Sequence, residues 1–237
     1  MNSMLAREGQ LRRALLQADR GRGGRRGRGF DARPSLWETN ENGFESLNQM
    51  RLARAGRLYF DRESMTPDHA TLILKSVGLP SLQAEHPVTR SVIAAIPADK
   101  VDYRPDSIAR SAIDLAWHIV TAENRFLEAV VSGAFDLTPR PRPDAVRAAA
   151  DVNAWYEERF AGNVGRLKGV SGEQLLKRID FRGLFQFPAV VYVQIALSHS
   201  VHHRGQLSMY LRPMGAKVPS IYGESYDARM AREAAQA

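Results

Sequence analysis

The chain of 237 residues contains no cysteine. A disulfide framework and a thiolate metal site are therefore excluded, and any transition-metal site must use imidazole or carboxylate ligands. Long apolar runs are also absent. The longest, residues 187–197, is interrupted by Gln194 and is far shorter than the roughly 20 residues that span a membrane. No apolar segment typical of a secretory signal occurs either, so we expect a cytoplasmic protein that does not enter the membrane.

Acidic residues are scarce at the N-terminus, and most of the net charge of +7 is located there. Residues 1–33 hold nine arginines and three acidic residues, which gives this segment a net charge of +6. The rest of the chain therefore carries only +1 of the total of +7. The Gly/Arg run at residues 21–29 cannot form a core, and we expect it to be disordered. It resembles disordered RNA-binding segments but is short and lacks interleaved aromatic residues. Nucleic acid is therefore not expected as a partner.

The character of the chain changes at Met65. Thr66, Pro67 and Asp68 form a helix start, with a capping hydroxyl, a proline in the first turn and an early acid. We expect residues 1–64 to be a disordered Arg/Gly-rich extension, residues 65–227 to be one domain and residues 228–237 to be a C-terminal tail. The extension is interpreted as an upstream mis-assignment of a start at Met65, and a genuine disordered tail is the alternative.

Periodic apolar residues, bounded by proline and glycine, predict an all-α four-helix bundle. A short segment at residues 179–187 could hold a strand or a turn. The first helix should kink or break at residues 78–80 and near Pro87. The four helices are predicted at residues 67–96, from between 107 and 111 to 133, at 144–167 and at 188–211.

Three histidines in two of these helices suggest a metal site. His199 and His203 are four residues apart and lie on one face of the last helix, one turn apart. An isolated His118 lies on an apolar stretch of the second helix, and a bundle core can bring such residues together. His202 is an alternative ligand. Neutral core histidines that bond to backbone carbonyls would explain the same pattern.

Several neighbours are weaker candidates for the site. Asp114 could accept a hydrogen bond from His118, although a solvated helix acid is favoured. Glu123 could be a general base, but its helical position is away from the His118 row. Arg204 could bind an anion, and a structural bridge between helices is favoured. The remaining candidates are Gln206 and Tyr210, which either line the pocket or pack in the core, and His69 and His86, which are expected at the surface.

Two stretches carry a family resemblance. Residues 112–127 (AIDLAWHIVTAENRFL) and 198–223 (SHSVHHRGQLSMYLRPMGAKVPSIYG) resemble the second- and fourth-helix signatures of the DinB/YfiT-like metalloenzymes. The link at residues 94–106 (AAIPADKVDYRPD) resembles the connection between the first two helices of that family. The resemblance covers residues 65–227. It implies a four-helix bundle, often dimeric, in which His118, His199 and His203 bind zinc, nickel or a similar divalent ion, with His202 outside the ligand set.

The resemblance also suggests an activity. Members of this superfamily include thiol-S-transferases, so it implies metal-dependent transfer of a low-molecular-weight thiol to a small electrophilic molecule. Hydrolysis by metal-bound hydroxide is the nearest enzymatic alternative. A bundle that binds metal only for stability or sensing is the non-catalytic alternative. The expected partners are thus a small-molecule substrate, a thiol and a second copy of the chain, and no catalytic residue is assigned.

Overall fold

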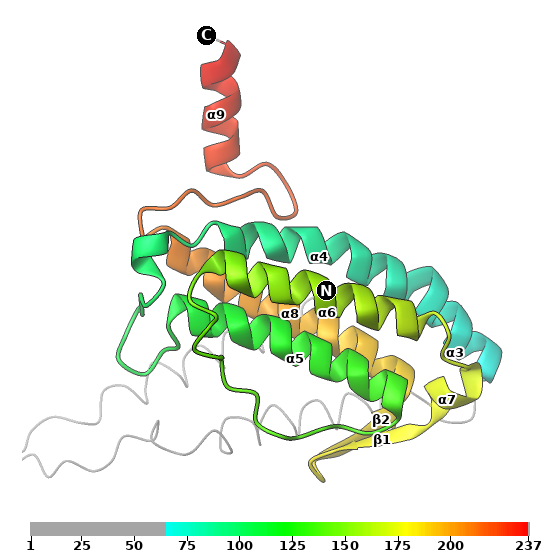
Figure 1. Ribbon diagram of the computed structural model, residues 1–237. Coiled ribbons are helices and arrows are strands. Elements are labelled where there is room, and N and C mark those ends of the chain that lie inside the picture. The colour runs from blue at the N-terminus through cyan, green and yellow to red at the C-terminus, as the bar shows by residue number, and fades with distance from the viewer. Residues whose placement is uncertain (1–64, 237) are drawn as a thin grey trace, which may run out of the picture. The chain divides into compact units, whose positions relative to one another are not determined.

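The computed structural model describes residues 65–236 (Figure 1). The predicted disordered extension at residues 1–64 lies outside the described residues. Long helices run alongside one another and confirm the predicted all-α bundle. Its elements are α3 (Pro67–Ile73), a π-helical turn (Leu74–Gly78), α4 (Leu79–Ala94), a 3-10 turn (Ala98–Lys100), α5 (Ala112–Ser132), α6 (Ala149–Leu167), α7 (Gly172–Leu176), β1 (Arg178–Phe181), β2 (Phe185–Pro188), α8 (Ala189–Leu211) and α9 (Tyr226–Gln236).

The helix ends follow local sequence signals. The Thr66 side chain accepts a hydrogen bond from the His69 backbone N–H, and the His69 ring accepts one from the Thr66 N–H. His69 is exposed, as predicted. Ser111 caps α5 by accepting a bond from the Asp114 N–H at 3.2 Å. Gly133 ends α5 with a φ of 82°, a left-handed conformation that glycine adopts without strain.

Of the kink or break predicted in the first helix, the break does not occur. Instead, the π-helical turn joins α3 directly to α4, and α4 continues through Pro87. A π turn is wider than an α turn, so it accommodates the Pro80 ring and its missing N–H without ending the helix. Gly78 lies in this turn, where an added Cβ would approach Val193 Cγ1 to 3.1 Å. The glycine therefore allows the first helix to pack closely against α8.

The third helix begins later than predicted, at Ala149 rather than near Asp144. The carboxylate of Asp151 accepts bonds from the N–H groups of Arg147 and Ala148, each at 2.8 Å, and so caps the helix at that point. The segment 179–187 forms an antiparallel hairpin in which Ile179 pairs with Phe187. That prediction of an extended segment is confirmed.

The core lies where α5 packs against α8 and α6. Buried residues cover most of α5, including Ile119, Val120 and Leu127. Tyr192 on α8 is fully buried and donates a hydrogen bond to the Ile179 carbonyl at 2.7 Å, which fixes the hairpin to the bundle. Helix α9 covers most of the predicted C-terminal tail, and none of its described residues is buried. Within residues 65–236, no helix has the length and apolar character needed to cross a membrane.

Candidate metal centre

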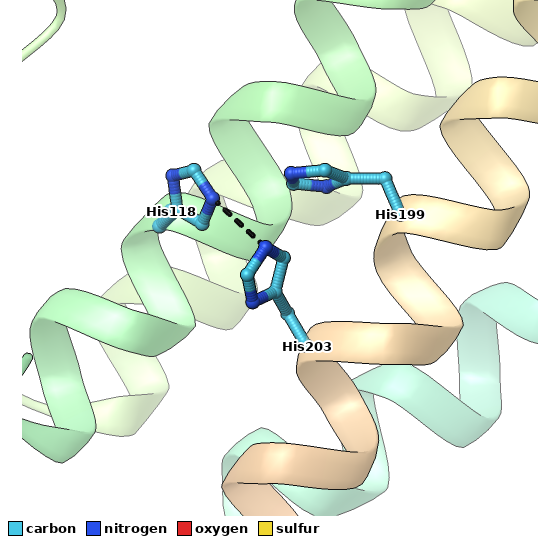
Figure 2. A group of neighbouring side chains, drawn as sticks. All are labelled: His118, His199 and His203. Carbon is cyan, nitrogen blue, oxygen red and sulfur yellow. Dashed lines mark hydrogen bonds between the residues drawn. The ribbon is translucent and has the colours of Figure 1, made fainter. Parts of the chain in front are cut away.

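The fold brings His118, His199 and His203 together between α5 and α8. Figure 2 shows the three rings directed toward one space, His118 from α5 and the other two from successive turns of α8. One ring nitrogen from each residue lies within 4.8 Å of the other two. The Nε2 atoms of His118 and His203 are 3.3 Å apart. The predicted convergence of these three histidines is thus present in the structure.

Burial keeps the three imidazoles neutral. It lowers the pKa of His118 to about 3 and that of His199 to about 2, and it also lowers the pKa of His203. The nearby positive charge of Arg110 acts in the same direction on all three. Neutral imidazole is the form that binds a metal, so protons do not compete for these nitrogens near neutral pH.

One pair of atoms in the donor set has the separation of two ligands of one metal ion, and all three donor atoms lie within 4.8 Å of one another. Two nitrogens at roughly 2.0–2.1 Å from a tetrahedral zinc ion stand about 3.3 Å apart, which equals the separation of the His118 and His203 Nε2 atoms. The buried Nδ1 of His199 has no hydrogen-bond partner among the described residues. No carboxylate belongs to this cluster of possible ligands in residues 65–236. Three neutral imidazoles accept zinc or nickel and leave at least one coordination position open.

Gln206 and His202 adjoin the cluster from α8. Gln206 Oε1 lies 2.7 Å from His203 Nδ1, and Gln206 Nε2 lies 3.1 Å from His202 Nε2. His202 is exposed and does not belong to the possible ligand set. Tyr210 packs edge-on against Tyr103, with ring centroids 5.8 Å apart. Of the two residues predicted as either pocket or core, Gln206 therefore contacts the site.

One neighbour prediction is wrong and another is settled in favour of its preferred alternative. Asp114 does not reach His118; it is a partly exposed helix acid that accepts bonds from Ser111 at 2.6 Å and Arg142 at 2.8 Å, so it joins α5 to the following loop. His86 is buried, not at the surface, because its face of α4 packs on α6. Its ring stacks on Phe160 with centroids 3.9 Å apart.

The expected structural role of Arg204 is confirmed. Its side chain is 1% exposed and pairs with Glu85 of α4 at 2.6 Å. The same guanidinium donates to the hydroxyls of Thr89 at 3.2 Å and Tyr222 at 2.6 Å. It therefore joins α8 to α4 and to the loop that follows α8. These partners come from two other parts of the sequence, α4 and the loop after α8, and Arg204 serves the fold beside the histidines.

A buried acid, whose role the sequence did not reveal, lies next to the histidine cluster. Glu123 on α5 is 2% exposed and accepts hydrogen bonds from Tyr156 at 2.6 Å and Ser200 at 2.7 Å. Burial raises the pKa of this carboxyl, against the opposing effect of its two hydrogen bonds. Ser200 follows His199 in the chain, so this network connects the second, third and last helices of the bundle next to the site. The sequence signal was weak, because Glu123 is followed directly by the polar residues Asn124 and Arg125 on α5.

Comparison with known proteins agrees with this architecture. The DinB family model matches residues 73–234, which is more than half of the chain. The chain belongs to the DinB family. It is also 27% identical over 130 residues to YjoA, an uncharacterized protein of Bacillus subtilis (strain 168), covering 54% of this chain and 82% of that protein. A second uncharacterized protein of the same organism, YrdA, is 31% identical over 116 residues, covering 46% of this chain and 64% of that protein.

Solved structures of DinB-like proteins share the fold. The crystal structure of YjoA from Bacillus subtilis matches with a TM-score of 0.51 and 24% identity, covering 61% of this chain and 96% of that one. A DinB-like protein from Bacillus cereus matches with a TM-score of 0.54 and 22% identity, covering 62% and 97% of the two chains. These similarities establish the helical fold of the DinB family for this chain.

Proposed function

We propose that this DinB family protein binds one divalent metal ion, zinc or nickel, on His118, His199 and His203. The observation that carries the proposal is the convergence of three neutral imidazoles with two Nε2 atoms 3.3 Å apart. Three neutral ligands leave the full charge of the cation uncompensated by the protein. A site of this kind favours an anionic group in its open position.

The reaction we propose is transfer of a low-molecular-weight thiol to a small electrophilic molecule. An ion held by His118, His199 and His203 would lower the pKa of a thiol, so that the thiolate would exist at neutral pH. The thiolate sulfur then forms a bond to an electrophilic carbon, the leaving group departs with the bonding electron pair, and the thiol proton passes to solvent. Arg110 adds positive potential at the three histidines and favours an anionic thiolate there.

A cluster of packed aromatic side chains adjoins the site. The ring of Phe126 lies beside His199, with centroids 6.1 Å apart, and packs edge-on against Phe135 at 5.5 Å. Phe135 in turn packs edge-on against Phe181 at 4.8 Å. Aromatic side chains exclude water and bind the carbon skeleton of a small molecule. This arrangement supports an organic electrophile as the substrate rather than a highly charged one.

Two measurements test the proposal. Elemental analysis of protein purified without a metal-affinity column should find about one zinc or nickel ion per chain. The metal-loaded protein should then conjugate a small thiol to an electrophilic probe, and His199→Ala should abolish the conjugation. If the protein binds metal but transfers no thiol in a screen of several thiols and electrophiles, it would be a non-catalytic metal-binding protein. Hydrolysis of ester probes without thiol would instead assign a hydrolase.

The homodimer remains a prediction of the family resemblance. In the described chain, Leu72 is 62% exposed and Val77 is 55% exposed, and they lie close together along α3 and the π-helical turn. A second copy would cover such apolar surface. Light scattering at micromolar concentration measures the mass directly, and a monodisperse monomer would remove the dimer without affecting the fold.

A further inference from the structure

The side chain of Gln206 touches two histidines of different roles. On α8, Gln206 is three residues after His203 and four after His202, so its side chain is a neighbour of both on the helix surface, one turn toward the C-terminus. Its Oε1 is 2.7 Å from His203 Nδ1 and its Nε2 is 3.1 Å from His202 Nε2. The three side chains thus form a chain of hydrogen bonds that ends at one of the proposed ligands.

The carboxamide determines where each proton lies. An amide oxygen only accepts, so His203 Nδ1 must carry the proton that it donates to Gln206. An amide NH₂ group only donates, so His202 Nε2 must be the unprotonated nitrogen of its ring. In neutral His203 the lone pair then lies on Nε2. In the metal-free protein that atom accepts the hydrogen bond from His118 Nε2 across 3.3 Å, inside the cluster of possible ligands.

We propose that Gln206 is the positioning residue of the metal centre, and that it fixes His203 in the tautomer whose Nε2 lone pair is directed at the metal. The inference rests on the proposed metal binding. A bond to the far nitrogen fixes the ring orientation and raises the basicity of the ligand nitrogen. His202 has a supporting role, since its Nε2 holds the amide in the orientation that places oxygen toward His203. This gives the non-ligand histidine of the HHRGQ sequence a function.

The same distances allow one rival arrangement. If the amide were reversed, its NH₂ group would donate to His203 Nδ1 and the ring proton would lie on Nε2. That proton would point at the cluster and would have to leave before a metal could bind. A Gln206 of purely structural value would leave the tautomer of His203 unaffected. The proposal therefore differs from both alternatives in the tautomer of His203, in the wild type or in a Gln206 variant, and this tautomer can be measured in the metal-free protein.

The first experiment measures the tautomer directly. Long-range proton–nitrogen NMR of the metal-free protein should find His203 protonated on Nδ1 in the wild type and in Gln206→Glu. Gln206→Leu should shift the ring toward the Nε2-protonated form, because the leucine offers no acceptor. A wild-type His203 protonated on Nε2, or a tautomer unchanged in Gln206→Leu, would overturn the proposal. This result does not depend on whether the protein catalyses thiol transfer.

The second experiment measures zinc affinity by competition with a chelator. Gln206→Leu should weaken binding by roughly 10–100-fold, and Gln206→Glu should bind at least as tightly as wild type because a carboxylate is a stronger acceptor. Gln194→Leu is the matched control, since Gln194 is also exposed on α8 but, within residues 65–236, its side chain bonds only to Ser198, at 3.2 Å. Equal affinities of Gln206→Leu and Gln194→Leu would overturn the proposal. A wild type that binds no metal would instead reject the proposed function, and the NMR result would still test Gln206.

Discussion

The hydroxyl of Ser200 donates a hydrogen bond to Oε2 of Glu123 over 2.7 Å, one residue along α8 from His199. This bond joins α5 and α8, the two helices that carry the three histidines. The other oxygen of Glu123 accepts from Tyr156 on α6 at 2.6 Å. A buried acid therefore sets how the helices around the candidate metal centre are held together, and its charge state should affect the stability of the bundle.

The first prediction concerns the pH dependence that Glu123 introduces. Burial raises its pKa above the unfolded value of 4.5, so the native state binds the proton more tightly than the unfolded chain. The stability from this group is complete below pH 4.5 and is lost as the pH rises through the higher native pKa. Glu123→Gln keeps a neutral partner for both hydroxyls. In urea titrations, wild type should lose stability relative to this variant as the pH rises above 4.5.

The control for Glu123 is Glu233→Gln in the exposed helix α9. A stability difference between wild type and Glu123→Gln that does not change with pH, or that changes as it does for the control, would contradict the prediction. Glu123→Leu should be destabilised by about 2–4 kcal/mol, because the buried hydroxyls of Tyr156 and Ser200 would lose their acceptor.

The second prediction concerns the ligands. His118→Ala, His199→Ala and His203→Ala should each lose bound metal in elemental analysis, since two imidazoles do not hold a zinc ion firmly. His202→Ala should retain it, because His202 lies outside the possible ligand set. Circular dichroism of each variant establishes that the helices still form. Loss of metal from His202→Ala with retention in His203→Ala would show that the assignment of the two adjacent histidines is reversed.

The third prediction concerns His86. Burial lowers its pKa to about 4 from an unfolded value of 6.5, and the buried Nε2 makes no hydrogen bond among the described residues. Between pH 6.5 and about 4 the unfolded chain binds a proton at this residue that the native state does not, so stability falls as the pH falls through this window. His86→Phe keeps the stacking on Phe160 and removes the proton. Its stability should decline less steeply across the same range, and equal slopes would reject this role.

The fourth prediction separates a buried ion pair from an exposed one. Arg204→Ala should destabilise the protein by about 3–5 kcal/mol, because Glu85 would lose its buried partner. Arg212→Ala removes a half-exposed pair with Asp227 and should cost about 0–1 kcal/mol. Tyr222→Phe should cost about 1 kcal/mol, since the ring still lies over the guanidinium while its hydroxyl bonds are lost. Thermal and urea unfolding measure all three changes, and similar losses for Arg204 and Arg212 would contradict the assignment.

The fifth prediction uses two glycines with opposite surroundings. A Cβ on Gly172 would collide with the backbone carbonyl of Pro67, where α7 meets α3. Gly172→Ala should therefore destabilise the protein by about 1–3 kcal/mol. Gly165 in α6 has no atom of the described chain near the position of an added Cβ, and Gly165→Ala should stabilise the helix by about 0.5–1 kcal/mol. Opposite shifts in the midpoint of thermal unfolding are expected, and shifts of the same sign would show that the α3–α7 contact yields.

Much of the fold could be predicted because its signals are local. Thr66, Ser111 and Gly133 define helix ends through side chains and backbone angles within a few residues. The later start of α6 was missed because the apolar pattern begins earlier in the chain. The carboxylate of Asp151 accepts a hydrogen bond from the Ala148 N–H and so fixes the start of the helix at Ala149. The continuous helix through Pro80 was missed because a π turn has no simple signature in the sequence.

For the site, the sequence alone placed His199 and His203 on one face of a helix, because a spacing of four residues fixes their relation through the helical repeat. It offered His118 as a third histidine that a bundle core could bring to the pair, and the resemblance to DinB proteins supported this grouping. Only the tertiary structure brought His118 within 3.3 Å of His203, joined Glu123 to Tyr156 and buried His86 against Phe160. These contacts join residues far apart in the chain. Their geometry depends on how whole helices pack, which no local pattern specifies.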